Sequence, residues 1–188
     1  MEVVVLIILA ALIVIAVVSV IGVRNGIIRE RNRCEEAWSG IDVQLKRRHD
    51  LVPNLVETVK GYASHEKEVF ESVTNARATA MAAHGAGKAG SAEQVLTAAL
   101  IDLRAVAENY PQLRATENFQ QLSSDLAEIE RQIQGSRDAY NADVQAYNTK
   151  IQVFPNLLIA RHGGFEPREF FAIDTRTERK PVAVRFES

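Results

Sequence analysis

Histidines that could bind a metal ion are few in this sequence, and they are badly spaced. His65-Glu66 begins like the zinc-protease pattern H-E-x-x-H, but Val69 stands where the second histidine is needed. The histidines, at positions 49, 65, 84 and 162, show no ligand spacing among themselves. We therefore expect no metal site and no cofactor, and we interpret these histidines as solvated or locally capping side chains.

Patterns for phosphate binding and nucleophilic catalysis are also incomplete. Gly87-Lys88 resembles the end of a phosphate-binding loop, but the leading glycine is missing and Ala89 replaces the required Ser or Thr. Cys34 is the only cysteine, and its position suits a small apolar core residue better than a nucleophile. There is no serine elbow and no dinucleotide fingerprint. The sequence favours a protein that is not an enzyme and has no catalytic residues.

The overall charge excludes a further class of partner. The net charge is −2 and the pI is about 6.1, so no basic field points to nucleic acid. A single cysteine cannot form an internal disulfide, which fits a reducing compartment. One basic cluster lies early in the chain and consists of Arg24, Arg29, Arg31 and Arg33.

The segment before that cluster predicts a membrane anchor. The 21 residues from Val3 to Val23 carry no charge. At ~1.5 Å per residue they make a helix of roughly 31 Å, the thickness of the hydrocarbon core of a bilayer. A cleaved signal peptide is disfavoured, because Met1-Glu2 is not basic and the apolar run is too long. We expect one membrane-spanning helix, with the lipid bilayer as a partner.

The arginines also predict how the helix is oriented. Because Lys and Arg are retained on the cytoplasmic side, the amino terminus should face out and the remaining domain should face the cytoplasm. The expected location is the inner membrane, crossed once. Gly22 and Gly26 form a weak G-x-x-x-G signal for pairing of anchors.

Apolar residues then recur in steps of four and three, which predicts a long helix with a 3.5-residue seam. The seam runs from Cys34 to Ala80, and only Arg48 and Glu66 interrupt it. Polar seam residues of this kind fix register or partner. Pro53 should either kink this helix or split it in two, which leaves three or four helices open.

A second seam runs from Phe119 to Phe154, and a shorter helix is expected to begin at Ser91, after a flexible loop over 84–91. Tyr140-Asn141 recurs seven residues later as Tyr147-Asn148, a spacing that would let both pairs bond a facing helix. The predicted fold is all-α: an N-terminal transmembrane helix followed by an elongated antiparallel three- to four-helix, coiled-coil-like bundle.

The C-terminal segment, residues 161–188, is rich in phenylalanine and predicts a short extended tail. Its last residues alternate at strand period, so the tail should dock on the bundle or pair with a neighbouring chain. The candidate interface residues are Phe165, Phe170, Phe171, Val182, Val184 and Phe186.

Several motifs together resemble the LemA family of bacterial membrane proteins. They are the run from Ala37 to Val56, Glu108-Asn109-Tyr110-Pro111, Glu117-Asn118-Phe119, Arg137 with the two Tyr-Asn pairs, and the closing Pro181 to Phe186. The resemblance implies an anchor (1–26), a LemA-like helical bundle (27–160) and the tail (161–188). It brings no accepted activity, cofactor or catalytic residue. The roles it implies are structural or membrane-organising, often beside a membrane zinc metalloprotease.

Two functions follow from these patterns. The first is a membrane-anchored scaffold that forms homo-oligomers by lateral self-association and organises or remodels the membrane. The alternative is an adaptor or accessory subunit for another membrane protein, such as a membrane zinc protease, with the tail as its docking element.

Overall fold

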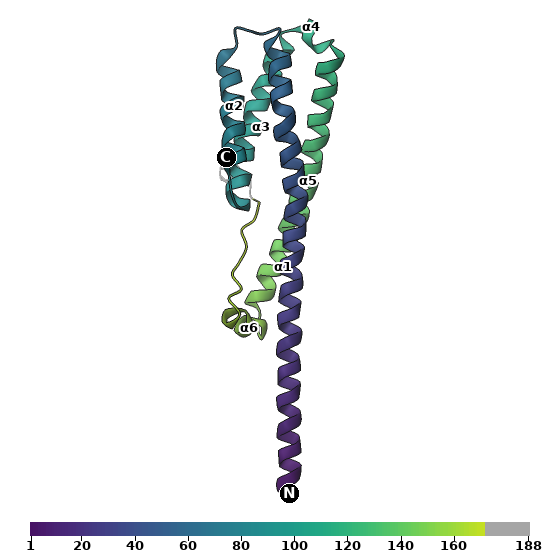
Figure 1. Cartoon of the computed structure of the whole chain (residues 1–188), viewed down its shortest axis with the longest axis vertical. Helices are drawn as coiled ribbons and strands as arrows, with labels where there is room; N and C mark the ends of the chain where they lie inside the picture. Colours follow the sequence, from purple (N-terminus) through teal and green to yellow (C-terminus); the bar gives the residue numbers. More distant parts are fainter. Residues whose placement is uncertain (172–188) are drawn as a thin grey trace, which may run out of the picture. The chain divides into compact units, whose positions relative to one another are not determined.

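The computed structural model describes residues 1–171, and those residues form helices joined by short turns, without a strand (Figure 1). The helices are α1 (Glu2–Lys60), α2 (Lys67–Ala82), α3 (Ala86–Glu108), α4 (Pro111–Arg114), α5 (Glu117–Gln152) and α6 (Asn156–His162). The prediction of a helical protein is confirmed, whereas the strand expected in the tail falls outside the described residues.

The chain divides into two compact units. The anchor unit comprises residues 1–47 and 128–170, and the hairpin unit comprises residues 48–127 and Phe171. Helices α1 and α5 each contribute one part to either unit.

Helix α1 is continuous over 59 residues, from the apolar run into the domain. It passes through Gly26, where the predicted anchor ends, and through Pro53, so of the two alternatives left open at Pro53 the split into two helices is excluded. Proline removes the helical bond to the carbonyl four residues earlier, which is that of His49. The Arg77 guanidinium donates from Nε to this carbonyl at 2.7 Å. A side chain of α2 thus satisfies the group that Pro53 leaves free.

The first helix ends at Lys60, and not near Ala80 as the seam predicts. Residues 61–66 form a turn, beginning at Gly61, a poor helix former. The seam positions Val73 and Ala76 on α2 are still buried. A heptad pattern marks the buried face of a helix, and that pattern is unchanged when the chain turns and packs back in a second helix.

Helix α3 begins at Ala86, so the prediction of a loop over 84–91 and a start at Ser91 is wrong. The left-handed Gly85, with φ of 87°, precedes it. Ala89 and Gly90 are buried in the first turns of α3, which packs against α2. The small residues that read as a flexible loop are there because two helices approach closely.

The core of the hairpin unit is built from aliphatic residues of α1, α2, α3, α4 and α5. Its fully enclosed members are Val52, Leu55, Val59, Val73, Leu96, Leu103 and Leu113. Burying each such side chain contributes about 1.5–3 kcal/mol.

In the anchor unit, α5 runs antiparallel to α1. The Trp38 and Tyr140 rings lie 5.5 Å apart, and further down α1 the Lys150 ammonium lies 3.1 Å from Glu30 Oε1. Residue numbers therefore rise along α5 as they fall along α1. The predicted second seam is buried here at Ile133, Tyr140, Val144, Tyr147 and Ile151.

Candidate functional site

The two tyrosines of the repeated Tyr-Asn pairs bind backbone carbonyls of the chain that follows α6. The Tyr147 hydroxyl donates to the carbonyl of Glu166 at 3.0 Å, and the Tyr140 hydroxyl donates to that of Glu169 at 2.9 Å. We call residues 165–170 the strap. Both tyrosine side chains are buried, so these bonds are shielded from water.

Asn148 adds two bonds to the same strap. Its side-chain amide donates to the Arg168 carbonyl at 3.0 Å, and its oxygen accepts from the Arg168 amide at 2.8 Å. One asparagine thus satisfies both backbone groups of one residue, as a neighbouring strand would. The spacing suggested a facing helix as the partner of these pairs, but the bonds of Tyr140, Tyr147 and Asn148 described here go to the strap. They hold an extended segment.

A glycine pair returns the chain from α6 to this position. Gly164 has φ of +67°, a left-handed conformation that favours glycine. A Cβ on Gly163 would lie 2.6 Å from Cε2 of Phe165, so a side chain there would displace that ring. The Phe165 amide donates to the Ala160 carbonyl at 3.0 Å, which closes the C-terminal end of α6.

Charge and burial reinforce the strap. Arg168 donates from Nη2 to Glu35 Oε1 at 2.6 Å. Burial raises the pKa of Tyr140 and of Tyr147, so both hydroxyls keep the proton they donate at neutral pH. Burial also raises the pKa of the nearby Cys34 thiol, which disfavours the thiolate that a nucleophile requires.

A second polar cluster is buried in the hairpin unit. Arg48 donates to Glu93 Oε2 at 3.0 Å and to the Thr97 hydroxyl at 2.7 Å. The His49 ring nitrogen Nε2 lies 2.6 Å from Glu93 Oε1. Arg48, His49 and Glu93 are each less than 9% exposed, so this cluster is a structural pairing of α1 with α3.

Arg48 therefore pairs with Glu93 of α3, whereas Glu66 lies in the turn before α2 and is half-buried. Sequence reasoning missed Glu93. The signal was present, because Glu93 precedes Leu96, Leu100 and Leu103 at steps of three and four on α3.

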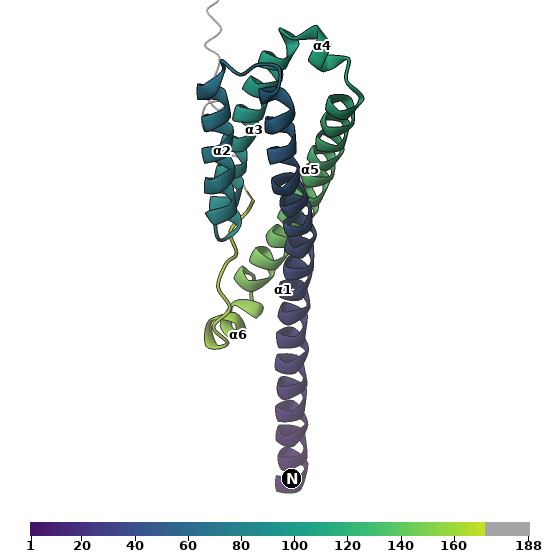
Figure 2. The ribbon, with the colours of Figure 1, turned by 45° about the horizontal axis from the view of Figure 1, so that its top comes forward.

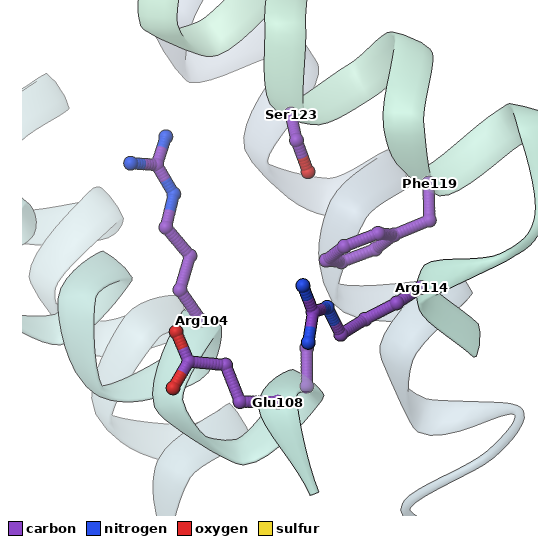
Figure 3. A pocket seen from close by; sticks show the side chains of 6 residues that line it. Arg104, Glu108, Arg114, Phe119 and Ser123 are labelled. Carbon is purple, nitrogen blue, oxygen red and sulfur yellow. The ribbon is translucent and has the colours of Figure 1, made fainter. Parts of the chain in front are cut away.

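An open pocket of about 260 Å³ lies where α3, α4 and α5 meet in the hairpin unit (Figure 3). Figure 3 shows the Arg114 guanidinium beside the Phe119 ring, with Arg104 on another side of the pocket. The Ser123 hydroxyl is buried and has no hydrogen-bond partner within the described chain. An activated serine needs a base within hydrogen-bond reach, and this hydroxyl has none among residues 1–171.

The apolar run is the part of the anchor unit that the rest of the unit leaves exposed. Within the described residues, α1 is the one helix long and apolar enough to cross a membrane, and its apolar window is 0% buried. Gly26 is buried, and a Cβ there would lie 3.2 Å from the Lys150 side chain. Gly22 is exposed and has open space around it. Gly26 therefore packs on α5, and the G-x-x-x-G is not a shared surface of the anchor.

Arg24, Arg29, Arg31 and Arg33 are exposed, and Arg31 and Arg33 pair with acidic neighbours on α1. Asn141 and Phe165 are half-buried, Phe170 is exposed and Phe171 is buried. Val182, Val184 and Phe186 lie outside the described residues.

The chain is similar to named proteins over most of its length. Magnetosome protein MamQ 2 of Paramagnetospirillum magneticum is 28% identical over 159 residues, covering 71% of this chain and 58% of that protein. MamQ of Magnetospirillum gryphiswaldense is 26% identical, with the same coverage. Protein LemA of Metamycoplasma hominis is 25% identical over 138 residues, covering 71% of this chain and 62% of that protein.

The chain spans less than two thirds of these relatives' own lengths, and none of their names is that of an enzyme. The model of the LemA family matches residues 37–186, which include the strap, the buried Arg48 cluster and both Tyr-Asn pairs. Since that match covers well over half of the 188 residues, the chain belongs to the LemA family.

Proposed function

We propose that this protein is a non-enzymatic scaffold, anchored in the inner membrane by α1, whose copies associate laterally through the exposed side of the α2–α3 hairpin. Such assemblies would organise or remodel the membrane that carries them. The observation that supports this proposal most directly is the scarcity of charge on that hairpin.

From Ala78 to Ile101 the one exposed residue with a full charge is Lys88, in a chain that is 24% charged. Met81, Val95 and Ile101 are each more than half exposed on the same stretch. Depletion of charge, with methionine and aliphatic residues exposed, is typical of the centre of a protein–protein interface.

Because the anchor confines every copy to the membrane, a weak contact between hairpins is sufficient for association. All copies share one membrane and one orientation, so each meets the others at a high effective concentration in two dimensions. A contact between identical hairpin faces can then form without a large interface.

The test uses the full chain carrying Val95→Cys, reconstituted in lipid and treated with a short bismaleimide. We expect covalent dimers, because each chain carries one reactive thiol, and a matched Glu71→Cys variant on the charged half of α2 should give far fewer. Cys34 is buried and should react little. In parallel, Val95→Glu with Ile101→Glu should shift the particles seen by electron microscopy in lipid toward monomers.

Equal cross-linking of both cysteine variants, or monomers only in lipid, would overturn the proposal. The adaptor function is the other outcome. In native membranes, one dominant product with a foreign membrane protein, and no self-product, would favour it.

A further inference from the structure

We propose that the corner between α5 and α6, residues 153–162, is a second membrane contact. It lies in the interface of the bilayer that α1 spans, with Phe154 and Leu158 entering the boundary between headgroups and acyl chains. This inference rests on the proposed anchoring by α1.

The corner exposes an unusual amount of apolar surface. Phe154 is 81% exposed, Leu158 is 55% exposed and Val153 is 45% exposed. These three side chains fall within six residues of one another, so they form one patch and are not isolated exposed residues. Ala160 is buried and Phe165 packs against Gly163, which holds α6 in place behind the patch.

The pairing of α5 with α1 puts the patch at the level of the membrane. Tyr140 lies beside Trp38, and ten residues later Lys150 reaches Glu30 and the position of Gly26. Continuing this antiparallel pairing for one more turn brings Phe154 to about the level of Arg24. The apolar run ends at Val23, so the patch lies within roughly one turn of the hydrocarbon boundary. Figure 1 and Figure 2 both show α6 beside α1, next to the end of α5.

The charges around the patch match a lipid surface. Arg24, Arg29 and Arg161 are exposed near this level. The nearby acid Glu30 is paired with Lys150 and Arg33. A basic rim around an aromatic and aliphatic centre is the composition that binds anionic headgroups and inserts into their boundary.

The position of the patch also distinguishes lipid from a protein partner. The exposed apolar surface of α1 runs from the amino terminus to Ile21. The patch belongs to the same unit and lies next to the Ile21 end of that surface. A soluble partner would have to enter the headgroup layer to reach Phe154, whereas lipid is already there.

The experiment places a polarity-sensitive fluorophore at Phe154→Cys or Leu158→Cys in the full chain. The protein is reconstituted in nanodiscs of phosphatidylcholine and phosphatidylglycerol, with and without spin-labelled lipids. Leu9→Cys, within the apolar run, reports whether the anchor is in lipid. Val43→Cys is the matched control, because Val43 is also exposed on the anchor unit but lies about 30 Å further along α1 from Val23.

We expect the labels at 154 and 158 to emit at shorter wavelength than the label at 43 and to lose fluorescence to shallow spin-labelled lipids. Insertion roughly 5–10 Å deep also protects them from aqueous iodide. Iodide access at 154 equal to that at 43, with the label at 9 still quenched by lipid, would overturn this inference and leave the anchor standing. Protection from both quenchers would also overturn it, since a second copy would then cover the patch. Loss of lipid quenching at 9 would refute the anchor itself.

Discussion

At the scale of single residues, the backbone of His49 shows how one side chain compensates for another residue's defect. Pro53 cannot donate to the His49 carbonyl, and Arg77 donates to it from α2. The ring of the same histidine bonds Glu93 of α3. Three helices therefore meet at one residue, at the place where α1 is intrinsically weakest.

This arrangement predicts a non-additive pair of substitutions. Arg77→Leu leaves a carbonyl without its partner and should lower the free energy of unfolding by about 1–3 kcal/mol. In a Pro53→Ala background the cost should be smaller, because the amide of residue 53 can then donate to the same carbonyl. Urea unfolding followed by circular dichroism measures all four members of the cycle. Strictly additive effects would show that the bond from Arg77 does not compensate for the proline.

A second prediction concerns acid stability and the Glu30–Lys150 pair. The hydrogen bond from Lys150 holds the pKa of Glu30 below its usual value. The pair therefore stabilises the fold above the unfolded pKa of about 4.3, and this stabilisation is lost as pH falls through the lower folded pKa.

Lys150→Met should remove that part of the pH dependence. The difference in free energy of unfolding between wild type and variant should be largest near neutral pH and should shrink below the usual glutamate pKa. Lys60→Met, which removes a lysine paired with an exposed glutamate, is the control. If the difference in free energy of unfolding between wild type and Lys150→Met stayed constant from neutral to acidic pH, the pairing would be contradicted.

At the scale of elements, the sequence predicted helices well and their ends poorly. A helix covers the apolar run, as its composition predicts, and another lies where the periodicity of the second seam places it. The turn at 61–66 was missed because α2 continues the same seam after folding back. The start of α3 was missed because Ala89 and Gly90 are small for close packing, and composition alone does not distinguish packing from flexibility.

The strap is the element that sequence reasoning could least foresee. Its bonds to Tyr140, Tyr147 and Asn148 use the backbone of residues 166–169, so the strap's own side chains carry little signal. The repeated Tyr-Asn pairs were visible, but helical spacing alone suggested a helix as their partner. Only the return of the chain at Gly163-Gly164 brings the true partner within reach.

Replacing Asn148 should release the strap from α5. Asn148→Leu removes two hydrogen bonds to the backbone of Arg168, each worth about 0.5–1.5 kcal/mol. Trypsin should then cleave after Arg168 roughly ten times faster or more, since local opening becomes more frequent. Gln145→Ala, an exposed change on the same helix, should leave that rate unaltered. An unchanged cleavage rate in Asn148→Leu would mean that the strap is held by other contacts.

At the scale of the whole molecule, the arginines behind the apolar run predict the orientation of the chain in the membrane. A Val43→Cys thiol should be protected from an impermeant maleimide in spheroplasts, because the predicted orientation puts the domain on the cytoplasmic side. Replacing Arg24, Arg29, Arg31 and Arg33 by Gln, with Glu2→Lys, should expose it in a large fraction of molecules. Lys46→Gln with Arg47→Gln removes positive charge beyond the short range over which orientation is set, and should change nothing. Labelling of the unaltered chain would contradict the proposed orientation.

The continuity of α1 has a mechanical consequence. Between the apolar run and the buried residues Cys34 and Ile41, the helix contains no turn that could act as a hinge. A span that is too long for its bilayer responds by tilting. In this protein such a tilt would carry α5 and the strap with it, so the anchor unit would lean as the membrane thins. Membrane thickness would then set the angle between the anchor unit and the plane of the membrane.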